Sequence, residues 1–144
     1  MLPPLITKQL VTILGEERLL VRSEDLQYYG LDRTTIWQAN PCAVVLPGSI
    51  KEVQQIILLA KEHNLAIVPS GGRTGLSGGS VAKNGEIVMA LDRLNKIQEF
   101  NPLDRTVTVG AGMITENLQN FAVEQGLFYP VDFASTGSSQ IGGN

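Results

Sequence analysis

The glycine-rich run at residues 69–80, PSGGRTGLSGGS, constrains this chain more than any other segment. Glycine loses more backbone freedom on folding than any other residue, so such a run suits backbone that approaches something closely or needs positive φ. Successive backbone N–H groups in such loops form concave nests that hold phosphate oxygens. The run therefore predicts a loop that binds an anion, with a nucleotide or a pyrophosphate as ligand. Its five glycines are Gly71, Gly72, Gly75, Gly78 and Gly79.

The overall composition limits the class of protein. The chain has 144 residues, 43% of them hydrophobic and 17% charged, which is typical of one globular domain with its own core. Its formal net charge of −3 argues against non-specific binding to nucleic acid or to an anionic membrane. No apolar run has the length of a transmembrane segment. We expect a cytoplasmic protein, with peripheral attachment to the inner membrane as an alternative.

The chain has one cysteine and one histidine, Cys42 and His63. A disulfide within the chain is therefore excluded, and we expect no metal site built from thiolate or imidazole ligands. Cys42 begins an apolar run and is interpreted as a small buried residue rather than a reactive thiol. We assign no catalytic residue.

The pattern of apolar residues predicts a mixed α+β fold. Residues 7–15 and 24–30 favour short helices within an N-terminal helical segment, residues 1–40, which precedes a second unit at 41–144. The apolar runs 43–46 and 65–68 predict strands. Between them, Ser49 and Glu52 form a capping box that begins a helix. Strand, helix and strand in this order favour a right-handed crossover between parallel strands. The expected buried face of the helix carries Val53, Ile56, Ile57 and Ala60.

A strand rather than a helix is expected after the glycine-rich run. Residues 86–91, 96–100 and 106–110 predict three strands, the last two joined by a turn. A helix capped by Thr115 is expected to end at Gly126. The chain then reaches a second glycine- and serine-rich stretch, residues 137–144.

Two common phosphate-binding motifs do not fit the chain. The P-loop spacing with its lysine is absent, and residues 71–79 lack both the Rossmann spacing and the helix that should follow. Residues 110–115, GAGMIT, imitate the Rossmann turn but have threonine in place of the third glycine, so a plain strand-to-helix turn is favoured. What remains is a pyrophosphate held by loop amides, or else a flexible surface loop. Hydroxyl groups of Ser70, Thr74 and Ser77 could add donors, and Arg73 could add charge if it turns inward.

The two glycine-rich stretches together resemble a known family. Residues 69–79 are similar to the pyrophosphate loop of flavoproteins of the vanillyl-alcohol oxidase/p-cresol methylhydroxylase (PCMH) type. Residues 129–132 (YPVD) and 137–144 (GSSQIGGN) resemble the later segment that lines the flavin and ribityl part of FAD. Within the family the branch resembled is that of D-lactate dehydrogenase, D-2-hydroxyglutarate dehydrogenase and glycolate oxidase.

The resemblance implies a set of FAD-binding residues. On the pyrophosphate side these are Pro69, Ser70, Gly71, Gly72, Arg73, Thr74, Gly75, Ser77 and Gly78. On the flavin side they are Pro130, Gly137, Ser138, Gly142 and Asn144. Many relatives attach FAD through a histidine in the first loop, where this chain has Arg73, so non-covalent FAD is expected.

The resemblance also implies an activity. The parent enzyme is expected to oxidise a D-2-hydroxy acid to the 2-oxo acid and to pass electrons to a quinone, a cytochrome or an electron-transfer flavoprotein. Residues 41–144 would form the first α/β subdomain and the start of the second in a PCMH-type fold that continues beyond this chain, which would be inactive alone. A homodimer is allowed, and no nucleic-acid partner is expected. The alternatives are a nucleotide-binding module or a dimerisation module without activity of its own.

Overall fold

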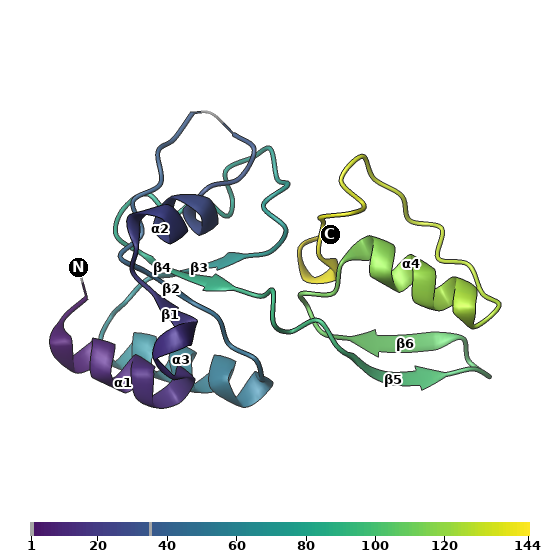
Figure 1. The fold of residues 1–144 in the computed structure, drawn as a ribbon, viewed down its shortest axis with the longest axis horizontal. Coiled ribbons are helices and arrows are strands. Elements are labelled where there is room, and N and C mark those ends of the chain that lie inside the picture. Colours follow the sequence, from purple (N-terminus) through teal and green to yellow (C-terminus); the bar gives the residue numbers. More distant parts are fainter. Residues whose placement is uncertain (1, 35) are drawn as a thin grey trace.

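The computed structural model describes residues 2–34 and 36–144. Figure 1 shows two lobes side by side, joined by an extended connection. The first lobe, residues 2–91, contains α1 (Pro4–Leu14), the 3-10 turn η1 (Glu16–Arg18), β1 (Leu19–Leu20), α2 (Ser23–Gly30), β2 (Ala43–Val45), α3 (Ile50–Glu62), β3 (Ile67–Ser70) and β4 (Ile87–Ala90). The second lobe, residues 97–144, contains β5 (Ile97–Asn101), β6 (Thr106–Val109), α4 (Thr115–Glu124) and the 3-10 turn η2 (Ile141–Gly143).

A four-stranded sheet with the order β1-β2-β4-β3 forms the centre of the first lobe. β2 and β3 both run parallel to β4, which aligns Val44 and Val68 with Val88, while β1 pairs antiparallel with β2. The expected parallel arrangement is thus present, with β4 between the two strands. β4 takes the central place because all four of its residues are apolar and buried. Helices α1 and α3 cover one face of the sheet and α2 lies on the other (Figure 1).

The N-terminal helix shares its core with the sheet. Leu10 and Leu14 of α1 are buried in one cluster with Ile56 of α3 and Ile87 of β4. The helix begins three residues before the expected residue 7, because Pro4 at its first position is already set for helical φ. β1, which the sequence did not indicate, extends the same sheet. Cys42 is partly buried beside this core, and burial raises the pKa of its thiol.

Helix α3 begins at the predicted cap but buries a slightly different face. The Ser49 Oγ accepts a hydrogen bond from the Glu52 amide at 3.2 Å. Ile56 and Ala60 are buried as expected, whereas the expectation for Ile57 was wrong, since it is 47% exposed. Leu59 is buried in its place, because α1 lies against that side of the helix.

The second lobe is an antiparallel hairpin of β5 and β6 with α4 against it. The rings of Phe100 and Phe121 meet edge to face with centroids 5.3 Å apart. Gly126 has a φ of +68° just beyond the last turn of α4, as expected of a glycine that ends a helix. Thr115 does not cap α4, because it is the first helical residue and its hydroxyl contacts Ser139 instead. No helix within residues 2–34 and 36–144 is long and apolar enough to span a membrane.

Candidate functional site

The glycine-rich loop leaves the carboxyl end of β3, at the side of the first lobe that faces the second (Figure 1). β3 begins at Ile67, two residues later than predicted, so Ser70 is its last residue. The side chain of Ser70 is fully buried and donates a hydrogen bond to the Tyr29 carbonyl at 3.3 Å. Its backbone carbonyl accepts from the Leu91 amide at 3.0 Å. The first residue of the loop therefore starts from a fixed anchor, at the strand end where open parallel sheets bind ligands.

The second glycine- and serine-rich stretch meets this loop across the gap between the lobes. A Cβ built on Gly72 would lie 2.0 Å from the Ser138 carbonyl oxygen, so only glycine allows this approach. The second stretch is held to α4 through Thr115, whose amide donates to the Ser139 carbonyl at 3.0 Å. The hydroxyl groups of Thr115 and Ser139 lie 2.8 Å apart, and the Asn144 Nδ2 donates to the Thr115 Oγ1 at 2.8 Å. Both sides of the gap are thus anchored to secondary structure.

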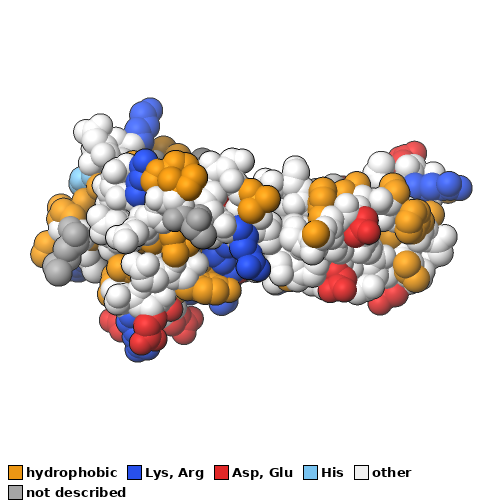
Figure 2. Space-filling view, turned by 90° about the horizontal axis from the view of Figure 1, so that it is seen from above, with side chains coloured by type: hydrophobic (Ala, Val, Ile, Leu, Met, Phe, Trp, Pro, Cys, Tyr) orange, Lys and Arg blue, Asp and Glu red, His pale blue; other side chains and the backbone are white. Residues whose placement is uncertain are grey.

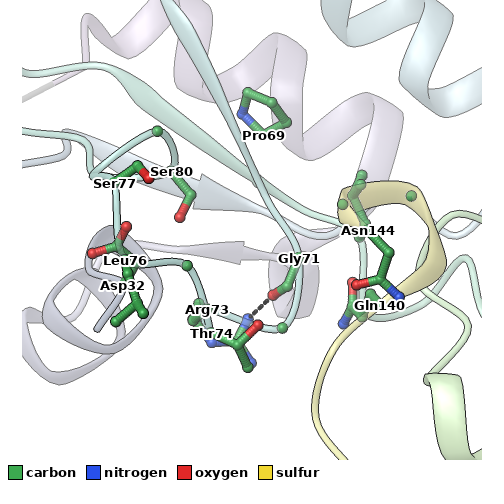
Figure 3. Close-up of a pocket in the computed structure, with 16 residues that line it drawn as sticks. Asp32, Pro69, Gly71, Arg73, Thr74, Leu76, Ser77, Ser80, Gln140 and Asn144 are labelled. Atoms are coloured by element: carbon green, nitrogen blue, oxygen red, sulfur yellow. Dashed lines mark hydrogen bonds between the residues drawn. The ribbon is translucent and has the colours of Figure 1, made fainter. Parts of the chain in front are cut away.

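Two adjoining pockets lie where the loops meet. The first has a volume of about 330 Å³ and is lined by residues of both loops (Figure 3). The second has a volume of about 530 Å³ and extends toward α2 and residue Asp92. The two pockets have lining residues in common, and we refer to the two together as the cleft. The shared residues are Asp32, Gly72, Arg73, Thr74 and Gln140.

The structure brings most of the expected binding residues to this cleft. In the first pocket lie Pro69, Gly71, Gly72, Arg73, Thr74, Gly75, Ser77, Gly142 and Asn144. In the second lie Gly137 and Ser138, together with Gly72, Arg73 and Thr74. Three expected residues line neither pocket: Ser70, Gly78 and Pro130. Ser70 and Gly78 instead fix the loop by hydrogen bonds to Tyr29 and Asp32 of the N-terminal segment. Pro130 is exposed.

The backbone of the loop presents unused hydrogen-bond donors. None of the amides of residues 71–77 donates a hydrogen bond to another of the described residues. The Gly78 amide is the next one along, and it is already bound to Asp32 at 2.9 Å. A row of free amides on an anchored loop is the donor set that a phosphate group requires. Figure 2 shows Lys and Arg side chains gathered on the first lobe beside the narrow waist, where an anionic ligand would meet favourable charge.

Arg73 is bound to the protein rather than free in the cleft. Its Nη1 donates to the Gly71 carbonyl at 2.8 Å, and its guanidinium pairs with Asp92 at 3.3 Å. The group also lies over the rings of Tyr28 and Tyr29, 4.6 and 4.9 Å from their centroids. Burial disfavours the charged form, but hydrogen bonding and charge at Asp92 and Tyr28 outweigh it and raise the pKa of Arg73. The side chain is a permanent cation that holds the loop, whose backbone at this residue has a φ of +58°.

Sequence reasoning missed the residues that support the loop from the N-terminal side. The Asp32 carboxylate accepts from the Thr34 amide at 2.8 Å and from the Gly78 amide at 2.9 Å. The Arg33 amide donates to the Gly75 carbonyl at 3.0 Å. No local signal marks the contacts of Asp32 with Gly78 and of Arg33 with Gly75, because each joins two segments that are far apart in the chain.

The Rossmann-like turn at residues 110–115 has a different use. A Cβ on Gly110 would lie 2.0 Å from the Leu94 carbonyl oxygen, and one on Gly112 would lie 1.9 Å from that of Leu91. These glycines let the start of α4 pack against the connection between the lobes. Neither glycine lines the cleft.

Comparisons with known proteins agree with this geometry. A family model described as an FAD binding domain matches residues 41–144. A D-2-hydroxyglutarate dehydrogenase from Xanthomonas citri pv. viticola is 58% identical over 127 residues, which cover 88% of this chain and 27% of that protein. A D-2-hydroxyglutarate dehydrogenase from Stutzerimonas stutzeri is 49% identical over 144 residues, covering 100% of this chain and 31% of that protein. The chain thus spans less than a third of the length of these relatives.

A solved structure shares the fold. The crystal structure of p-cresol methylhydroxylase with substrate bound superposes with a TM-score of 0.78 at 22% sequence identity, over 92% of this chain and 27% of that one. This likeness confirms the PCMH-type α+β fold expected from the sequence.

Proposed function

This chain belongs to the FAD-binding domain family, and we propose that it forms the FAD-binding portion of a flavin-dependent oxidoreductase acting on a D-2-hydroxy acid. The family match covers residues 41–144, and the cofactor of the family is FAD. The substrate class is inferred from the two relatives named D-2-hydroxyglutarate dehydrogenase. The product would be the corresponding 2-oxo acid.

The observation that supports this most strongly is the convergence of the two loops at Gly72. Residues 71–77, whose amides donate to none of the described residues, line one side of the cleft, and residues of the stretch 137–144 line the other. We infer that these amides, with the hydroxyl groups of Thr74 and Ser77, hold the diphosphate of FAD. Gly142 and Asn144 line the same pocket from the second lobe. They would contact the part of the cofactor that continues from the diphosphate.

A bound flavin would supply the redox chemistry. The part of this chain is to bind and orient the cofactor. Arg73, through its bonds to Asp92 and to the Gly71 carbonyl, holds the left-handed turn of the loop. The Asp32 carboxylate accepts hydrogen bonds from the backbone amides of Thr34 and Gly78, which fixes the conformation of the loop. No residue of the chain is assigned a proton-transfer role.

We further propose that FAD is held without a covalent bond. Attachment of the flavin to a protein requires a nucleophilic side chain beside it. The histidine and cysteine of this chain, His63 and Cys42, line neither pocket, and Arg73 stands at the loop position where many relatives carry the attaching histidine. Among the described residues, the cleft therefore offers no histidine or cysteine for attachment of the flavin.

Titration of the chain with FAD tests both proposals. We expect gel filtration to show FAD bound to the chain and a melting temperature that rises with FAD concentration, because a ligand of the folded state stabilises it. Acid precipitation should then leave all of the yellow colour in the supernatant. A chain that binds no FAD contradicts the proposed function, and colour retained in the precipitate contradicts non-covalent binding.

A further inference from the structure

Gln140 carries a buried polar atom that none of the described residues satisfies. The residue is only 5% exposed, and its Oε1 has no hydrogen-bond partner among the described residues. Its backbone is fixed by a bridge to Ile114, and the preceding residue, Ser139, is bound to Thr115. A buried amide oxygen without a donor opposes folding, because it has lost its hydrogen bonds to water. Such an atom calls for a partner outside the described residues.

The position of Gln140 indicates where that partner lies. Gln140 lines both pockets, at the junction of the cleft. Its Oε1 lies 3.4 Å from a Cβ built on Gly71, so it faces the start of the glycine-rich loop. Figure 3 shows Gln140 beside Asn144, across the pocket from that loop.

The chemistry of this wall differs from that of the glycine-rich loop. The loop offers amide donors, whereas Gln140 offers a carbonyl oxygen. Asn144 has its Nδ2 bound to the Thr115 Oγ1, which leaves its Oδ1 as the unbound atom of its amide. An ionised diphosphate has acceptors only and gains nothing from a carbonyl oxygen. The wall of the second lobe therefore suits a part of the ligand that bears O–H or N–H groups.

We propose that Gln140 is a cofactor-contacting residue whose Oε1 accepts a hydrogen bond from a hydroxyl or N–H group of the bound dinucleotide. The proposal rests on the proposed function, because it takes FAD as the ligand. It adds a residue that the sequence did not indicate and gives the cleft two chemically distinct walls. Donors on the first lobe bind the diphosphate, and an acceptor on the second lobe binds a neighbouring polar group of the same molecule.

Replacing Gln140 with methionine, Gln140→Met, tests the contact. Methionine has a similar length and no amide, so the variant removes the unsatisfied oxygen and keeps most of the volume. We expect the ligand-free variant to melt at the same temperature as the wild-type chain or higher. Its FAD dissociation constant should rise at least five-fold. A residue with a merely structural role would not combine unchanged or raised stability with weakened FAD binding.

Gln119→Met is the matched control. The Gln119 Nε2 donates to the Val131 carbonyl at 2.8 Å, and the residue lines neither pocket. This variant should lower the melting temperature and leave the affinity for FAD unchanged. The affinity of Gln140→Met for ADP shows which half of FAD carries the donor group. Unchanged ADP affinity assigns the donor to the flavin half, and weakened ADP affinity assigns it to the adenosine half. Either result supports the contact.

Two results would overturn the inference while leaving the proposed function intact. One is FAD affinity of Gln140→Met equal to that of the wild-type chain. The other is a loss of affinity that accompanies a melting temperature lowered as in Gln119→Met, since this indicates a structural role. A wild-type chain that binds no FAD would instead refute the proposed function itself.

Discussion

Gly72 and Gly78 show why the loop requires glycine at particular residues. At Gly72 a Cβ would meet the Ser138 carbonyl oxygen of the second lobe, and at Gly78 it would meet the Trp37 ring at 1.8 Å. Gly78 also has a φ of +75°, which side chains disfavour. Gly79, by contrast, has nothing within 4 Å of a built Cβ. Two neighbouring glycines of one loop are therefore under very different constraints.

These different constraints predict different losses of stability for alanine substitutions at Gly72 and Gly79. Gly72→Ala should destabilise the chain by about 1–3 kcal/mol, because the loop or the Ser138 backbone must shift to make room. It should also weaken FAD binding, since the two walls of the cleft move apart. Gly79→Ala is the control and should change stability by less than about 0.5 kcal/mol. Urea unfolding and FAD titration measure both effects, and equal behaviour of the two variants would contradict the close approach at Gly72.

At the scale of elements, the start of α3 is joined to the N-terminal segment by Glu52. Its carboxylate accepts from the Gly48 amide at 2.6 Å and from the Arg18 guanidinium at 2.8 Å. Burial alone would raise the pKa of Glu52, but these hydrogen bonds and the Arg18 charge outweigh it and lower that pKa. The pair therefore stabilises the fold when Glu52 is ionised.

The lowered pKa gives a dependence of stability on pH with a defined sign. A carboxyl group whose pKa is lower in the folded than in the unfolded chain adds stability above its unfolded pKa of about 4.3. This contribution is lost as the pH falls through the folded pKa. Glu52→Gln should therefore cost about 1.5 kcal/mol at pH 7. The difference from the wild-type chain should shrink as the pH is lowered from 7 to below the unfolded pKa, as measured by urea unfolding. A difference that is the same at both pH values would contradict the assignment.

The elements differ in how well sequence predicts them. β4 and the hairpin of β5 and β6 follow from their apolar or alternating patterns and turns, and the Ser49 cap follows from its spacing. β1 has only two residues and is formed by pairing with β2, so no local pattern marks it. The place of β4 between β2 and β3, and the exposure of Ile57, depend on which elements pack together. Periodicity along one segment does not contain that information.

At the scale of the whole molecule, the site exists because two lobes hold their loops face to face. The family and the two glycine-rich loops could be recognised from sequence, and the family match and the relatives confirm that resemblance. Asp32 and Asp92 could not be predicted, because each reaches the cleft through folding rather than through a motif. Gln140 lies within the motif at residues 137–144, but its unsatisfied side-chain oxygen becomes evident only in the structure. The binding roles of individual residues remain predictions that ligand titration can test.

The single tryptophan of the chain gives the most direct test of the central claim, that FAD binds between these loops. Trp37 packs on Gly78 of the glycine-rich loop, and its emission overlaps the absorption of flavin. The measurement is Trp37 fluorescence during titration with FAD, with free tryptophan amide as the control for light absorbed by FAD. The account predicts that emission falls to a plateau at a single FAD per chain. A decline without a plateau, identical to that of free tryptophan amide, would contradict it.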